Sequence, residues 1–547
     1  MTSLPPASPT PLNILWISLE DCSPRLGCYG DSLAQTPNLD ALAREGRLYE
    51  KAFCTAPVCA PARSAIITGM YAASVGAQHM RVKHNSPASH GRLPNYECVP
   101  PPFVKLLPEY LRAVGYFCSN NEKTDYQFRP PFTAWDAQGK DAHWRQRAQG
   151  QSFFAVFNNL VTHESGMWES HRAGSIVLHE RREPETNPAA VSVPSYLPDT
   201  LEIRKTIARQ YDNLHRADVW AGSLLRELEE DGLAENTVVF VWSDHGEGLP
   251  RHKRWLYDSG LRVPLLVRWP GRIAAGSVSR RLVSTIDLAP TVLRLAEVPV
   301  PAHFQGVDFL DSQATERRQV FATRDRYDEF YDCQRAVRDE RFKYIRTYHP
   351  ELPEMLWCEY FNKHPATREL WRLRREGTLP ESAKLFFRHP RPPEELYDTV
   401  ADPEERQNLA SDPDSTGKLT ELRAALESWQ AEIGDLFRED EAAMVRRFWP
   451  DGNQPRTAPP VLLAYDPERC GFVVEEEVRL AAPAMVQLHP PTQGASVGYR
   501  YADDPATRWR LYSGPIALPP GQYEIQAKAI RIGYGESPEA HFRISVG

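Results

Sequence analysis

Several features that define other protein classes are missing from this 547-residue chain. No apolar run is long enough to cross a bilayer, so we expect no membrane-spanning helix and no membrane partner. Residues 1–10 have neither the basic start nor the apolar stretch of a secretory signal, so we expect a cytoplasmic protein. The net charge is −8 and no basic repeat occurs, so nucleic-acid binding is not expected.

Cysteine is also scarce. The chain has nine cysteines, and this odd number, with no pair at metal-site spacing, argues against a disulfide framework. Most of them are expected to be buried structural thiols. Cys59 stands apart because the residues around it form a distinctive segment.

Two apolar runs far apart in the chain each end in a pair of metal-capable side chains. One run is followed by Glu20 and Asp21, and the other by Asp244 and His245. Short apolar runs bounded by polar breaks are typical of buried strands in an α/β sheet, which binds ligands beyond the carboxyl ends of its strands. Three carboxylates and an imidazole that converge there would be stabilised by a divalent cation. The alternative for either pair alone is a loop cap.

The segment between these runs suits a reactive group. Residues 59–63 read Cys-Ala-Pro-Ala-Arg. Pro61 suits the first turn of a helix, which places Cys59 near the positive N-terminal end and Arg63 on the same face. A thiol in that position is expected to have a depressed pKa. The alternative is a buried structural cysteine.

This order of residues resembles the signature of the sulfatase family, Cys-x-Pro-x-Arg followed by a short helix. The family belongs to the alkaline phosphatase superfamily and converts the cysteine to formylglycine after translation. The resemblance therefore implies the same change at Cys59, made by a formylglycine-generating or sulfatase-maturating enzyme. It covers most of the first 440 residues, and the stretch 395–409 is most similar to the heparan N-sulfatase (sulfamidase) branch.

Further positions match the residues that the family uses around its substrate. Lys123 and Lys253 match lysines that contact sulfate, and His163 matches a histidine on the substrate side. Asp125 stands where the family usually has histidine, and we expect it to assist collapse of the covalent intermediate. The resemblance implies that His163 or His252 protonates the leaving group. The alternative for so many charged residues is a set of solvated loops.

The resemblance also implies one divalent metal, held by Glu20, Asp21, Asp244, His245 and the residue derived from Cys59. The family usually has aspartate where Glu20 stands and often asparagine where His245 stands. Oxygen-rich sites favour calcium or magnesium, whereas an imidazole favours manganese or zinc. We expect calcium, with manganese as the alternative.

The implied mechanism begins with a hydrated formylglycine at position 59. One hydroxyl attacks sulfur, the alcohol or amine departs, and the second hydroxyl expels sulfate and restores the aldehyde. The resemblance implies that Arg63, Lys123 and Lys253 neutralise charge on the sulfuryl oxygens and on the hydrate.

Three regions follow one another along the chain. Residues 11–315 alternate strand-like and helix-like patterns, which predicts an α/β domain with a mostly parallel sheet sandwiched by helices. Residues 316–447 predict a smaller α+β subdomain, with a strand over 338–345. After a Pro/Gly-containing break at 449–455, residues 456–547 predict an all-β immunoglobulin-like domain, which resembles one found on some glycoside-processing enzymes.

Aromatic residues of this last region have two interpretations. Trp509 and Tyr512 either lie in its core or contact sugar or a second subunit, and a homo-oligomer is therefore left open.

The residues and the resemblance together predict a sulfatase that hydrolyses a sulfate ester or a sulfamate of a small substrate, with a saccharide among the candidates. A related alternative is a phosphodiester or phosphonate monoester hydrolase, because Asp-His-Gly at 244–246 also recurs in that branch of the superfamily. The non-enzymatic alternative is a metal-stabilised carbohydrate-binding protein in which Cys59 remains a thiol.

Overall fold

An eight-stranded sheet forms the centre of the protein. The computed structural model describes residues 11–80, 82, 95–169, 183–311, 313, 316–329, 331–505 and 508–547. Its strands are β1 (Asn13–Leu19), β2 (Arg47–Phe53), β3 (Phe117–Asn121), β4 (Ala137–Gln138), β5 (Phe153–Asn159), β6 (Thr237–Ser243), β7 (Leu265–Arg268) and β8 (Ser277–Ser284). They lie in the order β4-β3-β5-β1-β6-β7-β2-β8. Neighbours run parallel except at β7, which is antiparallel to both β6 and β2. The predicted mostly parallel sheet is confirmed.

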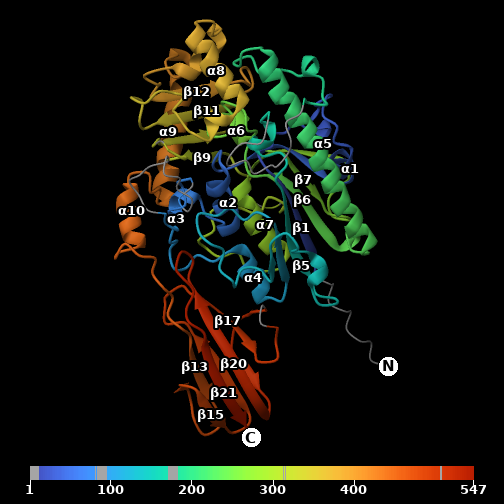
Figure 1. Cartoon of the computed structure of the whole chain (residues 1–547), viewed down its shortest axis with the longest axis vertical. Helices are drawn as coiled ribbons and strands as arrows, with labels where there is room; N and C mark the ends of the chain where they lie inside the picture. The colour runs from blue at the N-terminus through green and yellow to red at the C-terminus, as the bar shows by residue number, and fades with distance from the viewer. Residues whose placement is uncertain are drawn as a thin grey trace.

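Helices cover both faces of this sheet (Figure 1). Helix α1 (Pro37–Glu45) and most of α5 (Leu201–Glu230) pack on one face, and α2 (Cys59–Thr68), α4 (Leu107–Ala113) and α7 (Leu288–Leu295) pack on the other.

Strand β1 shows why its sequence is a continuous apolar run. Ile14 and Trp16 belong to the core beneath α2, whereas Leu15 and Ile17 belong to the core beneath α1. A strand that is buried on both faces has no polar side to alternate with.

A smaller antiparallel sheet lies beside the first, at the top of Figure 1. Its order is β12-β11-β10-β9, from β9 (Val320–Arg324), β10 (Gln334–Arg338), β11 (Phe342–Thr347) and β12 (Glu394–Asp398). Helix α9 (Thr416–Ile433) packs on it. The remaining α-helices of the described chain are α3 (Ala72–Val75), α6 (Asp258–Leu261), α8 (Pro365–Glu376) and α10 (Glu441–Phe448).

The strand predicted over residues 338–345 is wrong in its bounds. The Asp339 carboxylate accepts hydrogen bonds from the backbone N–H groups of Arg341 (2.8 Å) and Phe342 (2.6 Å). This aspartate turn ends β10 and lets β11 begin at Phe342.

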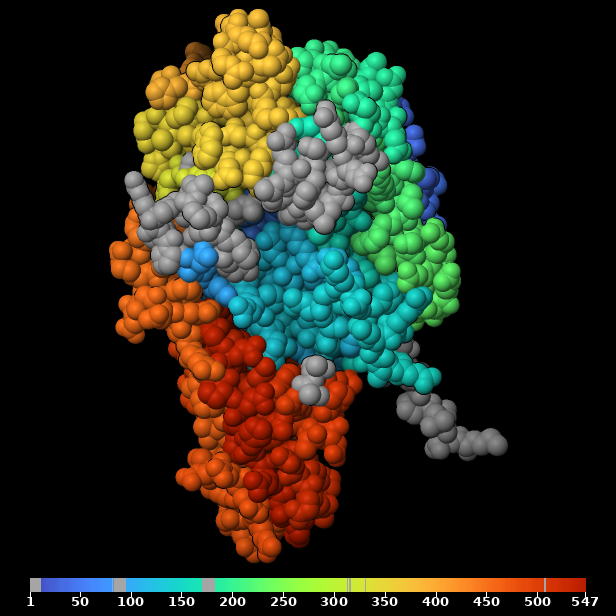
Figure 2. Space-filling view, viewed as in Figure 1, coloured from blue at the N-terminus to red at the C-terminus, as the bar shows by residue number. Residues whose placement is uncertain are grey.

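The last part of the chain is a β-sandwich, which extends as a narrow lobe from the broader main body (Figure 2). One sheet has the order β14-β13-β16-β19 and the other β15-β21-β20-β17-β18. Their bounds are β13 (Val461–Tyr465), β14 (Phe472–Val474), β15 (Glu477–Leu480), β16 (Ala484–His489), β17 (Ser496–Tyr501), β18 (Arg510–Leu511), β19 (Ile516–Leu518), β20 (Gly521–Ile530) and β21 (Ala540–Val546). The mixed α/β part followed by an all-β part agrees with the predicted fold class.

Trp509 joins the sandwich to the main body, which neither interpretation of the sequence anticipated. Its backbone oxygen accepts a hydrogen bond from Arg112 Nη2 at 2.7 Å, and its ring centroid lies 5.6 Å from that of Phe132. Lys105 Nζ makes a further link, to the backbone oxygen of Gly494 at 2.7 Å. Tyr512, by contrast, packs against the core of the sandwich.

All nine cysteines are thiols that form no disulfide. Within the described part of the chain, every helix is too short or too polar to cross a membrane.

Candidate active site

Four neighbouring strands end at one place. In the order β3-β5-β1-β6, the carboxyl ends of all four strands lie along the same edge of the sheet because the strands are parallel. The residues that follow these ends are Glu20 and Asp21 after β1, Lys123 and Asp125 after β3, His163 after β5, and Asp244 and His245 after β6. Chain topology therefore brings together most of the candidates that the sequence places far apart.

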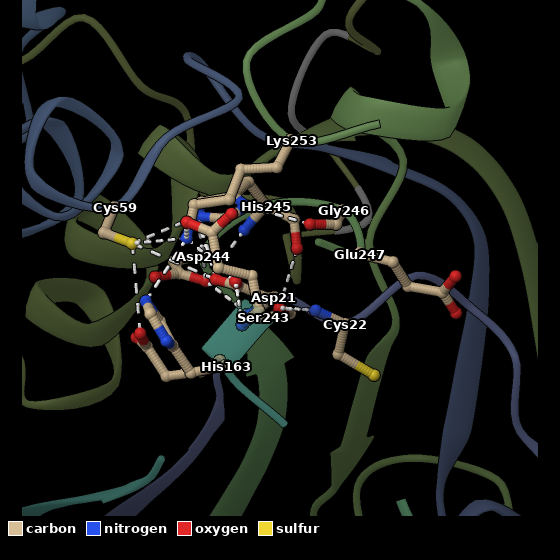
Figure 3. A network of polar contacts seen from close by, with 12 residues as sticks. Asp21, Cys22, Cys59, His163, Ser243, Asp244, His245, Gly246, Glu247 and Lys253 are labelled. Atoms are coloured by element: carbon tan, nitrogen blue, oxygen red, sulfur yellow. Dashed lines mark hydrogen bonds and ion pairs between the residues drawn. The ribbon is translucent and has the colours of Figure 1, made fainter. Parts of the chain in front are cut away.

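Cys59 points its sulfur atom into this group from one side (Figure 3). Its Sγ is 3.2 Å from His245 Nε2, 3.6 Å from Lys253 Nζ, and 3.9 Å from a carboxylate oxygen of each of Glu20 and Asp21. Cys59 is only 2% exposed. Its Sγ marks where the oxygen atoms of a modified side chain would lie.

The expected depressed pKa of this thiol is wrong. Helix α2 begins at Cys59, as predicted, but all ten of its residues are buried. Burial raises the pKa of the Cys59 thiol well above its ordinary value and outweighs the lowering by Lys123 and Lys253. As an unmodified cysteine, the side chain is therefore a poor nucleophile.

Arg63 connects the strand ends to one another. Its Nε donates to Asp244 Oδ2 at 3.0 Å, and its Nη1 donates to Asn158 Oδ1 at 2.8 Å. Its Nη2 donates to Ser18 Oγ at 3.0 Å and also pairs with Glu20. Since each guanidinium nitrogen already has a protein partner, the geometry favours a role in fixing the carboxylates over direct contact with sulfuryl oxygens.

The donor atoms suit a divalent cation. They lie within 4.8 Å of one another in two overlapping groups: Glu20, Asp21, Cys59 and His163, and Asp21, Cys59, Asp244 and His245. Burial tends to raise the pKa of Asp244, but His245 and Arg63 hold it below its usual range, so this carboxylate stays ionised and able to bind a metal. Carboxylates with one imidazole fit a hard or borderline divalent ion.

Two lysines approach the centre from separate loops. Lys253 Nζ lies 2.8 Å from Asp21 Oδ2 and 3.2 Å from Glu164 Oε1. Lys123 Nζ pairs with Glu20 and lies 3.1 Å from Asp125 Oδ2. Burial opposes the charge on each lysine, but the surrounding anions raise both pKa values well above the ordinary value. Both side chains therefore stay cationic, as anion binding requires.

Asp125 stands at the edge of this group, about one-third exposed at 30%. Burial tends to raise its pKa, but Lys123 lowers it and keeps the carboxylate ionised.

The two candidate histidines lie in different surroundings. His163 Nδ1 accepts from the backbone N–H of Ser165 (3.3 Å), and its Nε2 lies 3.4 Å from Lys253 Nζ. Burial and the nearby lysines hold the pKa of His163 well below its usual value. His252 Nε2 instead lies 2.8 Å from the hydroxyl of Tyr196, and among the described residues His252 has no hydrogen bond to the group around Cys59. Of the two histidines, only His163 lies beside Lys253 and the group around Cys59.

Sequence reasoning missed several residues that complete the site. Asn158 binds Arg63, while Glu164 pairs with both Lys253 and Arg254. Asn158 stands at a strand end, and that position was the one available signal. Other signs are backbone conformations that only a structure reveals, because Asp21, Asp125 and Arg254 have φ values of 42°, 49° and 78°. Non-glycine residues held in the left-handed region cluster at functional sites.

Comparison with known proteins gives this site a family. Residues 12–298 match the model described as Sulfatase, and residues 246–358 match the model described as N-sulphoglucosamine sulphohydrolase, C-terminal. An ulvan-active sulfatase of Formosa agariphila is 39% identical over 96% of this chain and 90% of its own length. The N-sulphoglucosamine sulphohydrolase of Homo sapiens is 29% identical over 78% of this chain and 91% of its own length.

A similar solved structure is a complex with its substrate D-glucosamine-2-N,6-O-disulfate. It has a TM-score of 0.55 and 19% identity, and the match covers 78% of this chain and 98% of that one. At this identity it supports the fold. The family model and the Formosa relative together show that the chain belongs to the sulfatase family, whose members are sulfuric ester hydrolases that use a formylglycine and a divalent metal.

Proposed function

We propose that this chain hydrolyses a sulfate ester or a sulfamate of a saccharide, with formylglycine at position 59 as the nucleophile. The observation that carries the proposal is the position of Cys59 Sγ, which lies close both to the metal-capable side chains and to Lys253. No other described residue combines such a position with this motif.

Asp21, Asp244, His245 and Glu20 would hold the metal, and we propose calcium, with manganese as the alternative. A divalent cation in this position supplies Lewis-acid activation of the nucleophile and of the sulfuryl oxygens. Metal analysis of the purified protein, followed by removal and return of each ion, distinguishes calcium from manganese.

The chain's own residues account for the remaining requirements. One hydroxyl of the hydrated formylglycine forms a bond to sulfur while the bond from sulfur to the departing oxygen or nitrogen breaks. Lys123 and Lys253 bind the sulfuryl oxygens and offset the charge that spreads over them. The second hydroxyl then gives its proton to the ionised Asp125 carboxylate, the carbonyl re-forms, and the bond between carbon and the sulfate oxygen breaks, which releases sulfate.

The leaving group needs a proton, and His163 is placed to supply it. Since its Nδ1 is occupied by the Ser165 N–H, Nε2 is the atom that faces the reaction centre and Lys253. To act as the acid, the His163 ring takes the imidazolium form. Its Nε2–H gives the proton to the departing oxygen or nitrogen, and the ring returns to the neutral form that burial and the nearby lysines favour.

A saccharide substrate is supported by the names of the relatives and by aromatic residues at the surface. Trp357 is 56% exposed and Tyr331 is 42% exposed. Trp357 lies three residues before Tyr360, whose ring centroid is 6.2 Å from that of His163. Exposed aromatic rings offer stacking surfaces for a sugar.

Maturation is expected to precede folding. Every residue of α2 is buried, including Cys59, so a modifying enzyme would reach this segment while the chain is still unfolded.

The test compares turnover of a small aryl sulfate, an N-sulfated glucosamine and a phosphonate monoester by the metal-loaded protein. Preference for either sulfated compound supports the proposal. Faster hydrolysis of the phosphonate would transfer the assignment to the phosphonate hydrolase branch.

A further inference from the structure

Glu164 links the reaction centre to a second buried cation. It is the first residue of the short 3-10 helix η3 (Glu164–Met167), directly after His163, and it is fully buried. Its carboxylate accepts two hydrogen bonds from Arg254, at 2.8 and 2.9 Å. The same carboxylate lies 3.2 Å from Lys253 Nζ.

The Lys253 ammonium therefore lies between two anions. Asp21 Oδ2 is 2.8 Å away on one side and Glu164 Oε1 is 3.2 Å away on the other. Because an ammonium has three N–H donors, these two acceptors leave one N–H for the side of the reaction centre, where His163 Nε2 lies 3.4 Å and Cys59 Sγ 3.6 Å from Nζ. A flexible lysine side chain is thereby restricted to one useful orientation.

Arg254 holds Glu164 in place from the opposite side. Its guanidinium lies over the ring of Phe361 and its Nε is 3.6 Å from Asp328 Oδ2. Arg254 and Asp328 both have positive φ values, 78° and 55°, a backbone conformation that is uncommon for residues other than glycine.

Close packing also fixes the backbone of Glu164. A Cβ atom added at Gly248 would lie 2.4 Å from Glu164 Cβ, so only glycine lets the segment after His245 pass this closely. The Glu164 backbone N–H donates to Asp21 Oδ2 at 2.7 Å, an interaction that does not depend on the side chain at position 164.

We infer that Glu164 is a positioning residue for the sulfuryl-transfer reaction: it holds Lys253 over residue 59, and Arg254 holds Glu164. This inference rests on the role proposed above for Lys253. Glu164 itself touches neither the nucleophile nor the sulfuryl group.

The experiment uses the mature, metal-loaded enzyme with a small aryl sulfate as the probe. Glu164→Gln keeps the shape and the backbone donor but removes the charge. We expect kcat to fall about 10- to 100-fold, the size of one lost hydrogen bond to a charged group. KM should change by less than about threefold, because misorientation of Lys253 acts mainly on the transition state. The metal content should be unchanged.

Coupling with Lys253 separates positioning from general damage. If Glu164 acts through Lys253, adding Glu164→Gln to Lys253→Ala lowers kcat by less than about twofold further. Full additivity of the two changes, or a normal kcat in Glu164→Gln, would overturn the inference. Normal kinetics in Lys253→Ala alone would instead overturn the role proposed for that lysine.

Two further variants guard against loss of folding. Glu441→Gln removes an equally buried carboxylate that binds Arg326 at 2.6 and 2.7 Å, and it should lower stability without lowering kcat. Glu164→Asp keeps the charge that folding needs but is too short to reach both cations, so its kcat should lie between those of wild type and Glu164→Gln. Wild-type kcat in Glu164→Asp would contradict a positioning role.

Discussion

Removal of either active-site lysine tests the proposed sulfate pocket. Lys253 is 2% exposed and Lys123 is 11% exposed, and each pairs with a buried carboxylate near Cys59. In Lys123→Ala and in Lys253→Ala, the sulfuryl group loses one hydrogen bond from a charged donor, which is worth about 1.5–3 kcal/mol. That loss corresponds to a decrease in kcat/KM of roughly 10- to 150-fold.

The assay is steady-state hydrolysis of a small aryl sulfate by each single variant and by the double variant. Since both lysines bind one ligand, the double variant should show a non-additive loss. Lys140 provides a matched control, because its side chain is 83% exposed and lies 4.0 Å from Glu122. Lys140→Ala should keep wild-type kinetics. Near-normal kcat/KM in both single variants would refute the pocket, even if residue 59 proved to be modified.

Four other predictions concern the nucleophile, the metal, the buried arginine and acid stability. Cys59→Ala should abolish turnover and leave the far-UV circular dichroism spectrum unchanged, and measurable turnover by this variant would exclude residue 59 as the nucleophile. Asp21→Ala and Asp244→Ala should each lose bound metal and activity together in elemental analysis, because each removes a ligand; full metal content in both would show that the two carboxylates are loop caps. Arg63→Met should lower the free energy of unfolding in urea by about 3–5 kcal/mol, because it leaves the buried carboxylates of Glu20 and Asp244 without their cationic partner. A loss below about 1 kcal/mol would contradict the role of Arg63 in fixing these carboxylates. The pKa of Glu441 is lowered to about 2, because His79 and Arg326 outweigh the opposing effect of burial. Its contribution to stability, on the order of 3 kcal/mol, is therefore fully present above its unfolded pKa of about 4.5 and is lost as the pH falls through about 2. Urea unfolding of wild type and Glu441→Gln should converge over that range, and a constant difference between them would contradict the assignment.

The sequence predicts those parts of the site that follow from strand ends and from one helix start. The apolar runs before Glu20 and Asp244 are strands β1 and β6, and helix α2 begins at Cys59. Apolar runs and a proline in the first turn of a helix depend only on residues that are neighbours in the chain, so the sequence is enough to predict them. The pattern that predicts the β-sandwich is also local, because it consists of short strand-like segments separated by turns with proline and glycine.

The parts that the sequence did not predict depend on contacts between distant segments. Glu164 and Arg254 are 90 residues apart in the chain, and neither has a local pattern that marks it as part of the site. His252 and Lys253 are adjacent, yet of the two only Lys253 contacts Cys59, whereas His252 contacts Tyr196. No periodicity in this loop signals which of the two side chains points toward the site. The pKa of Cys59 was mispredicted for the same reason, since the depth of burial of α2 depends on the elements that cover it.

The mass of the peptide that contains residue 59 tests the central claim most directly. The protein is produced together with a formylglycine-generating enzyme, digested, and measured by mass spectrometry. The account predicts an aldehyde at position 59, seen as the mass of formylglycine or its hydrate in place of cysteine, in a sample that hydrolyses sulfate esters. Sulfatase activity from a sample in which residue 59 is entirely unmodified cysteine would contradict it.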